Sequence, residues 1–333
     1  MLSKFFKTYV YYKLNRINLF SVMYRITNRC NLRCTYCSLW KDKFREATTE
    51  EAKYLMDQLV KANVTYMTFS GGEPTLRKDL TIISRYAMKR GIFTTLNTNG
   101  TLINRKKAYE YLTSFNVISV SIDGFEKTHN MLRGNNSYKN AVRGIENLID
   151  AKNSFNGRGA KIGINTIIHP DNLDDIIPLF EKYAPDVNFV AFQPLHPPTD
   201  IDFKKLDKLI IDLLQFKKRT GKLFAPDYYI KYLHKFFKGQ SMKICGAGKD
   251  FALLNSDGSL FACPFIYGPL RDRLKLGNLL EEDIITILRS PHTKKVIELL
   301  KNCNGCMNEW SLIRFYFDHP LQLLPYAVNE IIS

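Results

Sequence analysis

Residues 27–40 read TNRCNLRCTYCSLW and place Cys30, Cys34 and Cys37 in one short loop, with the spacing C-x3-C-x2-C. The loop directly follows an apolar run at residues 20–26 that is typical of a buried strand. In parallel α/β barrels the chemistry lies at the carboxyl ends of the strands, so a reactive centre is expected here. Three thiolates can hold three irons of a [4Fe–4S] cube and leave the fourth iron open, since such clusters normally take four cysteines. The alternative is a partial zinc site with a distant fourth ligand.

The rest of the first two-thirds of the chain alternates strand-like and helix-like segments. Further strands are predicted at residues 64–69, 92–97, 117–122, 161–168 and 187–193. Helices are predicted at residues 48–62, 78–90, 104–115, 137–153, 172–183 and 202–219. Six strands alternating with helices predict a parallel α/β sheet, and strands buried on both faces suit a barrel or partial barrel.

The cysteines divide the chain into two parts. Three lie near the start and four, Cys245, Cys263, Cys303 and Cys306, near the end, with none between. A disulfide framework would favour an even count and a different spread, so the split indicates two metal centres in a reducing compartment. We expect a (β/α)6 partial TIM barrel at residues 21–220, after an N-terminal amphipathic helix at 1–20. Linker helices and a small cysteine-bearing domain follow at 221–333.

Charge and hydropathy restrict the location and the partners. The formal net charge is +16, and eight Lys or Arg precede the first carboxylate, Asp42. This bias favours anionic partners, although a solvated basic surface explains it equally well. Because no apolar run reaches 18 residues and no secretory signal is present, we expect a cytoplasmic protein. The N-terminal amphipathic segment and the apolar tail at 321–332 fit either peripheral membrane contact or closure over the barrel.

The pattern C-x3-C-x-aromatic-C, formed by Cys30, Cys34, Tyr36 and Cys37, resembles the radical S-adenosylmethionine (SAM) superfamily. The resemblance implies that SAM chelates the open iron through its amine and carboxylate. One electron from an external donor such as ferredoxin or flavodoxin then cleaves the sulfonium. The resulting 5′-deoxyadenosyl radical abstracts a hydrogen atom from a substrate.

Polar and glycine residues at the ends of the predicted strands support this resemblance. Gly71, Gly72, Glu73 and Pro74 resemble the superfamily's GGE motif, whose carboxylate binds the SAM amino group, although alone they could form an ordinary turn. Further expected SAM contacts, at the ends of the third to fifth strands and in the segment after the fourth, are Asn97, Asn99, Ser121, Asp123, Arg133 and Asn165. His169 and His196 also follow strands, where a structural role is the more common one.

The second cysteine set resembles the SPASM or shorter twitch extension of radical SAM enzymes. Cys245, Gly258 and Cys263 form C-x12-G-x4-C, Cys303 and Cys306 form C-x2-C, and NSDGSL between them predicts a hairpin turn. A full SPASM domain carries seven cysteines, so four imply one auxiliary [4Fe–4S] cluster. Zinc is the alternative for such a closed four-cysteine site. The auxiliary cluster would transfer electrons or brace the domain.

The function expected is therefore hydrogen abstraction by a radical SAM enzyme of oxidoreductase or transferase type. Absence of an obvious peptide-recognition domain favours a small-molecule, sugar or lipid-linked substrate, an anionic one being an option. A peptide maturase is the first alternative. Transfer RNA comes third, and nucleic acid is not an expected partner. The alternative from another class is a non-enzymatic metal-binding protein associated with nucleic acid.

Overall fold

The computed structural model describes residues 10, 14, 19–240, 245–264, 272–301, 303 and 306–308. Most of the expected N-terminal helix at 1–20 and the whole apolar tail at 321–332 lie outside the described residues. None of the described helices combines the length and apolar character that crossing a bilayer requires.

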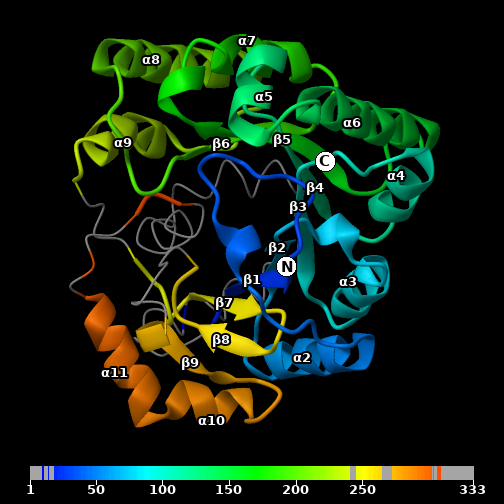
Figure 1. Cartoon of the computed structure of the whole chain (residues 1–333), viewed down its shortest axis with the longest axis vertical. Coiled ribbons are helices and arrows are strands. Elements are labelled where there is room, and N and C mark those ends of the chain that lie inside the picture. The colour runs from blue at the N-terminus through cyan, green and yellow to red at the C-terminus, as the bar shows by residue number, and fades with distance from the viewer. Residues whose placement is uncertain are drawn as a thin grey trace.

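Six parallel strands form the centre of the molecule and pair in sequence order, so the expected partial barrel is confirmed (Figure 1). They are β1 Ser21–Thr27, β2 Tyr66–Gly71, β3 Phe93–Thr98, β4 Val117–Ser121, β5 Lys161–Ile168 and β6 Phe189–Pro194.

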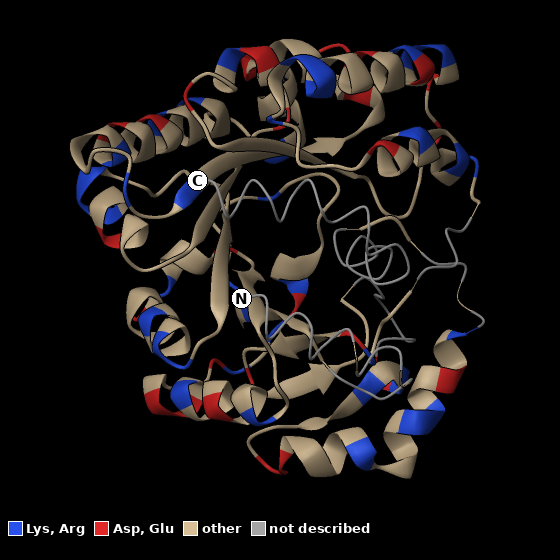
Figure 2. Cartoon of the chain, turned by 180° about the vertical axis from the view of Figure 1, so that it is seen from behind, with Lys and Arg blue, Asp and Glu red and all other residues tan. Residues whose placement is uncertain are grey.

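Helices cover the outer side of this sheet (Figure 1). They are α2 Thr49–Lys61, α3 Leu80–Lys89, α4 Arg105–Leu112, α5 Glu126–Arg133, α6 Ser137–Ser154, α7 Ile176–Tyr183, α8 Phe203–Thr220 and α9 Asp227–Phe237. Short 3-10 turns lie at Leu39–Lys41, Pro74–Leu76, Pro170–Asn172 and Asp272–Leu274. Charged residues lie mainly on these helices and few lie on the strands, as Figure 2 shows. The amphipathic periodicity of the helices therefore turns their apolar stripes onto the sheet.

The strand register separates an outer face from an inner face, because alternate residues of a strand point to opposite sides. On the outer face one continuous row of buried side chains crosses five strands: Tyr24, Phe69, Leu96, Ile118 and Ile162. The ring of Phe69 contacts that of Phe115 beyond α4, so this row packs toward the helices. The inner face is more polar: Asn97 pairs with Ser119, and Ser121 with Asn165.

The C-terminal segment extends the same sheet. β7 Phe251–Asn255 pairs parallel to β1, while β8 Ser259–Phe261 and β9 Lys275–Asn278 continue antiparallel. The turn at residues 255–259 is the predicted hairpin, with Gly258 at φ +84°. Helices α10 Ile284–Arg289 and α11 Pro291–Leu300 follow. The cysteine-bearing part is thus joined to the barrel by a strand ladder along the edge of β1.

Candidate active site

The three-cysteine loop leaves β1 and crosses the carboxyl ends of the neighbouring strands. Cys30, Cys34 and Cys37 are each half-buried, and no disulfide joins any cysteine of the chain. Burial raises the pKa of Cys30, and it raises that of Cys34 to about 11, with the nearby thiols adding to both. The Leu32 N–H also donates to Cys30 Sγ over 3.4 Å. The thiols therefore interact and would become thiolates on binding a metal centre, which deprotonates a coordinating thiol.

Gly71 and Gly72 fix the base of this loop. The Gly72 N–H donates to Thr27 O and the Glu73 N–H to Arg29 O, both over 2.8 Å. A Cβ on Gly71 would lie 2.2 Å from Thr27 O, and one on Gly72 would lie 2.1 Å from Arg29 O. A side chain at either glycine would therefore clash with backbone carbonyl oxygens. In the structure the two glycines admit the backbone of the cysteine loop itself.

Glu73 is 1% exposed and connects β2 to β3. Its Oε1 accepts hydrogen bonds from the Thr75 N–H and hydroxyl and from the Thr98 hydroxyl, at 2.7–3.0 Å. Its Oε2 accepts from the Asn99 N–H over 2.7 Å. A carboxylate oxygen has two lone pairs, so Oε2 retains capacity for one further donor such as an ammonium. Pro74 follows at the start of a 3-10 turn and is buried.

Asn99 joins the cysteine loop to the end of β3. Its Nδ2 donates to Asn31 Oδ1 over 2.9 Å, and Asn31 Nδ2 donates to the Thr101 hydroxyl over 2.8 Å. Asn31 lies between the first two cysteines. Sequence reasoning predicted Asn99 but missed Asn31, Thr98 and Thr101. Thr98 and Thr101 lie beside Asn99 in the stretch NTNGT, and Asn31 lies between two of the cysteines. These positions were the sequence signal that could have identified them.

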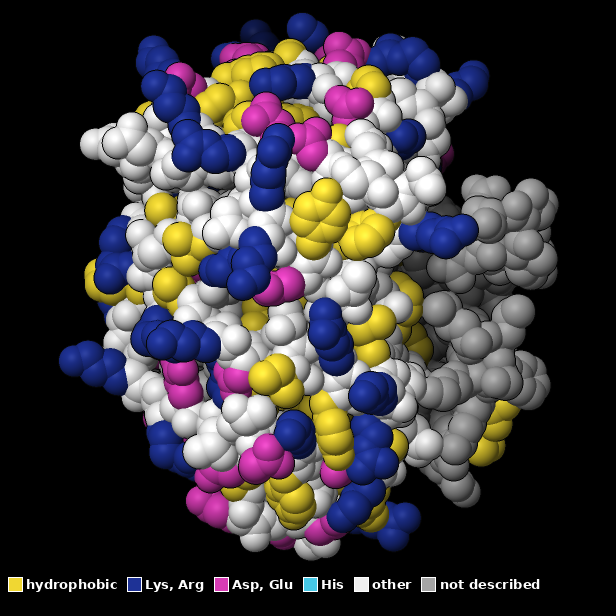
Figure 3. All heavy atoms as spheres, turned by 90° about the vertical axis from the view of Figure 1, so that its right-hand side faces the viewer, with side chains coloured by type: hydrophobic (Ala, Val, Ile, Leu, Met, Phe, Trp, Pro, Cys, Tyr) yellow, Lys and Arg dark blue, Asp and Glu magenta, His cyan; other side chains and the backbone are white. Residues whose placement is uncertain are grey.

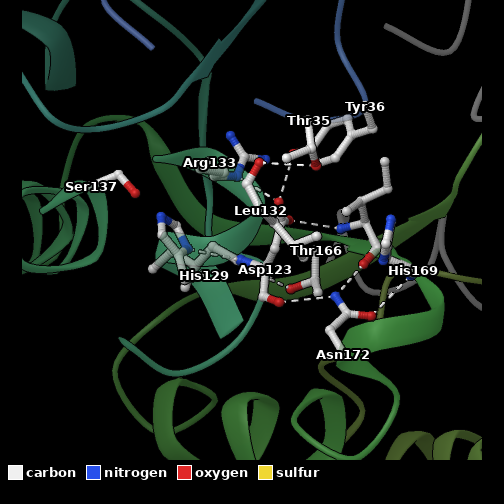
Figure 4. Close-up of polar contacts among 12 residues, drawn as sticks. Thr35, Tyr36, Asp123, His129, Leu132, Arg133, Ser137, Thr166, His169 and Asn172 are labelled. Atoms are coloured by element: carbon white, nitrogen blue, oxygen red, sulfur yellow. Dashed lines mark hydrogen bonds and ion pairs between the residues drawn. The ribbon is translucent and has the colours of Figure 1, made fainter. Parts of the chain in front are cut away.

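Asp123 and Arg133 hold the other side of the loop (Figure 4). Asp123 is fully buried, and its Oδ2 accepts from the Tyr36 hydroxyl over 2.6 Å and pairs with Arg133 Nε over 2.5 Å. The Arg133 guanidinium also lies 5.8 Å from the Tyr36 ring centre. The Thr35 N–H donates to Leu132 O over 2.9 Å. The loop is thereby attached to the C-terminal end of α5.

Electrostatics keep this cluster charged. Burial by itself would raise the pKa of Asp123, but the adjacent Arg133 charge outweighs it and lowers the pKa below its ordinary value. Burial raises the pKa of the Tyr36 hydroxyl well above its usual range despite Arg133. The Asp123 N–H donates to His129 Nδ1 over 3.1 Å, and burial lowers the pKa of His129 to about 4. Asp123 and Arg133 therefore form a buried ion pair beside a neutral histidine.

Three expected SAM contacts lie on the inner face, separate from these hydrogen-bond networks. Asn97, Ser121 and Asn165 are half-buried side chains on β3, β4 and β5. Ser70 and Gln193 share this face. Ser70 is adjacent in sequence to the outward-facing Phe69, and Gln193 pairs with Ile167, which lies two residues after Asn165 on the same strand. The structure thus adds a polar surface below the cysteine loop.

Of the two candidate histidines, His169 lies closer to the loop. Its ring centre is 6.4 Å from that of Tyr36, and its Nδ1 accepts from the Asp171 N–H. It therefore has a capping role in a turn, as expected for a histidine beside proline. His196 is half-buried and lies against Phe236.

The second cysteine set also comes together. Burial raises the pKa of Cys306, and the thiols of Cys263, Cys245 and Cys303 add to this rise, so all three lie close enough to influence Cys306. Asn308 Nδ2 donates to Cys306 Sγ over 2.9 Å. Arg25, 2% exposed on β1, donates from Nη2 to Pro264 O over 2.8 Å beside Cys263. Sequence reasoning missed this arginine, since no local pattern distinguishes it.

The donor chemistry of both sets fits iron–sulfur clusters. Each set brings thiols together without disulfides, and each includes an N–H donor to a sulfur, a feature that tunes cluster potentials. Within the described residues, no three His, Cys, Asp or Glu side chains converge as for a single metal ion.

Comparison with known proteins identifies two families in the chain. Residues 24–183 match the radical SAM superfamily, and residues 245–307 match the SPASM iron–sulfur cluster-binding domain. These two stretches contain all seven cysteines and the GGE residues. The resemblance noted from the sequence is thereby confirmed.

Among curated proteins, the mycofactocin maturase of Mycolicibacterium smegmatis is 27% identical over 323 residues, covering 90% of this chain and 79% of the maturase. The AdoMet-dependent heme synthase of Methanosarcina barkeri is 27% identical over 323 residues, covering 86% and 90%. The Fe-coproporphyrin III synthase of the same organism is 36% identical over 165 residues, covering 48% of this chain and only 40% of the synthase.

Solved structures share the fold. SuiB of Streptococcus suis bound to S-adenosylmethionine superposes with a TM-score of 0.69 at 18% identity, covering 89% of this chain and 75% of SuiB. The protein anSMEcpe with bound AdoMet gives a TM-score of 0.65 at 20% identity, covering 93% and 99%. At this identity the likeness concerns the fold alone.

Proposed function

The chain belongs to the radical SAM superfamily and carries a SPASM iron–sulfur domain, and from this premise we propose that it is a maturase whose substrate is a polypeptide. It is an enzyme that uses SAM and two [4Fe–4S] clusters. Bound SAM supplies, on one-electron reduction from an external donor, the means to abstract hydrogen from an unactivated carbon.

The first cluster would be held by Cys30, Cys34 and Cys37, and the auxiliary one by Cys245, Cys263, Cys303 and Cys306. The Oε2 atom of Glu73 would accept a hydrogen bond from the SAM ammonium, because it alone of the two carboxylate oxygens retains capacity. Gly71, Gly72 and Pro74 would set the position of that carboxylate.

Asp123, Arg133, Tyr36 and Asn99 would position the cysteine loop rather than react. Their polar groups already bond to one another or to loop residues. Asn97, Ser121 and Asn165 would face the adenosyl part of SAM or the substrate across the inner face. No chemical role is assigned to His169 or His196.

The observation that carries the polypeptide proposal is the similarity to a maturase through both domains, over 90% of this chain. The Clostridium novyi anaerobic sulfatase-maturating enzyme adds a second such relative, 25% identical over 320 residues. The inner face also suits a peptide, because each peptide residue presents an amide donor and a carbonyl acceptor. The Asn, Ser and Gln side chains there can satisfy both. These points favour the peptide alternative over the small-molecule substrate first expected.

A tetrapyrrole substrate is the second candidate, because two synthases of that class are among the relatives. The inner face argues against it, since a flat macrocycle needs broad apolar contacts on its two sides. At the carboxyl ends of the strands, the described inner face presents mainly half-buried polar side chains, Ser70, Asn97, Ser121, Asn165 and Gln193, with the apolar Ile167 beside Gln193.

The test is anaerobic reconstitution with iron and sulfide, followed by measurement of 5′-deoxyadenosine from SAM and dithionite. Synthetic peptides with varied side chains, iron-coproporphyrin III and a nucleotide sugar are added separately. A peptide is expected to accelerate cleavage and to change in mass. Acceleration by the porphyrin or the sugar, with no response to any peptide, would replace this proposal.

A further inference from the structure

A concentration of positive charge surrounds the three-cysteine loop. Residues 29–45 contain a single carboxylate, Asp42. They also contain five exposed basic side chains: Arg29, Arg33, Lys41, Lys43 and Arg45. Arg29 is neutralised by Glu46 and Arg45 by Glu51, at 2.7–2.8 Å. Within the described part of the chain, Arg33, Lys41 and Lys43 form no ion pair. This leaves three uncompensated cations beside the predicted cluster ligands.

Trp40 connects these cations to the loop. Its indole Nε1 donates to Cys37 O over 3.0 Å. The Arg33 guanidinium lies 4.6 Å and the Lys41 ammonium 5.4 Å from its ring centre, both within cation–π range. Arg33 also donates to Cys30 O over 2.7 Å. The aromatic ring and the cations around it are therefore part of the same structural unit as the cysteine loop.

Other parts of the surface also carry many charged side chains. On the face over α2, α3, α4 and α6, Lys and Arg alternate with Asp and Glu (Figure 3). Pairs such as Arg90 with Asp57 and Lys53 with Glu50 neutralise charge there. Lysines without a described ion pair, such as Lys106 and Lys208, also occur elsewhere. What distinguishes the cations near the loop is their contact with the Trp40 ring and, for Arg33, with the backbone of Cys30.

We propose that Arg33, Trp40, Lys41 and Lys43, the cationic patch, form the docking surface for an acidic one-electron carrier protein of the flavodoxin or ferredoxin class. The carrier gives up one electron and the cluster at the three cysteines gains it, with no bond formed or broken. This inference rests on the proposed function, because it needs a reducible cluster at that loop.

The composition of the patch favours a protein over a nucleic acid. Protein interfaces are enriched in Trp and Arg and have a polar, solvent-accessible rim. Complementary charge steers an acidic carrier to the surface and aligns it before contact. Docking here would bring the redox centre of the carrier next to Trp40, which is hydrogen-bonded to the backbone of a cluster-binding cysteine.

The test uses the double variant Lys41→Glu/Lys43→Glu in the reconstituted holoenzyme, with Lys106→Glu/Lys208→Glu as the control of equal charge change. Lys106 on α4 and Lys208 on α8 are exposed and, among the described residues, have no ion pair. Binding of a bacterial flavodoxin and of a [4Fe–4S] ferredoxin is measured by calorimetry at two salt concentrations. The rate of cluster bleaching by each reduced carrier is compared with the rate given by dithionite.

We expect the patch variant to bind at least one carrier about tenfold more weakly at low salt and to lose most of the salt dependence. The ratio of carrier-driven to dithionite-driven bleaching should fall by a similar factor, while the control pair stays near the wild type. Wild-type affinity in the patch variant, equal weakening in the control, or no binding by the wild type would each overturn the inference. So would a single-stranded RNA that binds the patch without displacing the carrier. Failure of dithionite to bleach any cluster would instead refute the proposed function.

Discussion

Gly72 shows how one absent side chain determines the position of a reactive loop. The loop carbonyls of Asn28 and Arg29 occupy the space that a Cβ would need. The pattern GGE could be read from the sequence, but the reason for its glycines could not. The atoms that they accommodate belong to a segment more than 40 residues earlier, and only the folded strand pairing brings the two together.

Replacing Gly72 with Ala should therefore displace the cysteine loop. The added Cβ would lie 2.1 Å from Arg29 O, and such overpacking typically costs about 1–3 kcal/mol of unfolding free energy. We expect lower thermal stability and a reduced iron content after reconstitution. Gly221→Ala is the control: its φ of +67° strains the substituted residue, so it should also lower thermal stability, but no atom lies within 4 Å of the added Cβ and the iron content should stay normal. Normal iron incorporation in Gly72→Ala would contradict this reading.

His129 should make stability depend on pH. Its pKa in the folded protein is about 4, below the value of about 6.5 in an unfolded chain. The unfolded state thus binds a proton first, so the contribution of neutral His129 is complete above pH 6.5 and declines as the pH falls toward 4. The loss is about 3 kcal/mol at most. The free energy of unfolding of wild type and of His129→Asn is measured with denaturant from pH 4 to 8. Its dependence on pH should differ between the two proteins only below pH 6.5. The exposed His292→Asn serves as control and should keep the wild-type slope.

At the scale of secondary structure, the alternation of strands and helices was predictable and α5 was not. Residues 161–168 were predicted with their observed bounds, because β-branched residues alternate in this stretch. α5 was missed because its sequence, EKTHNMLR, is short and polar. It is stabilised by the Asp123–Arg133 pair and by His129, contacts that no helical periodicity reveals. This helix nevertheless holds the cysteine loop through Leu132.

Removing Arg133 should therefore loosen α5 and the loop together. Arg133→Met leaves the buried Asp123 carboxylate without its cation, which typically costs about 3–5 kcal/mol. The double variant Asp123→Asn/Arg133→Met should recover part of that loss, because no unpaired charge remains. A double-mutant cycle in denaturant unfolding measures the coupling. Strictly additive losses would show that the two side chains do not stabilise each other.

At the scale of the whole molecule, the two cysteine sets could be read from the sequence, but the way in which the parts that carry them are joined could not. The seven cysteines and the hairpin turn could be read directly from spacing. The pairing of β7 with β1 could not, since it joins segments 230 residues apart by backbone hydrogen bonds that leave no trace in residue type. The polar inner face could not be predicted either, because it depends on the register between strands that are far apart in the sequence.

The two cysteine sets should remain chemically separable. Cys306→Ala is expected to remove about four irons while the protein still cleaves SAM. Cys34→Ala should remove the other cluster and abolish cleavage altogether. Iron and zinc analysis, with electron paramagnetic resonance of the reduced proteins, distinguishes the outcomes. Zinc in place of the second set of irons, or loss of both clusters in Cys306→Ala, would contradict this assignment.

The shared sheet also constrains how such an enzyme can be dissected. A chain truncated before residue 245 would lack β7. The backbone amides and carbonyls of β1 that pair with β7 would then be unpaired. Bare edges of this kind recruit other strands, so the shortened protein should self-associate instead of behaving as an independent barrel. Exchange of the C-terminal part between relatives would then succeed only where the incoming hairpin matches the register of β1.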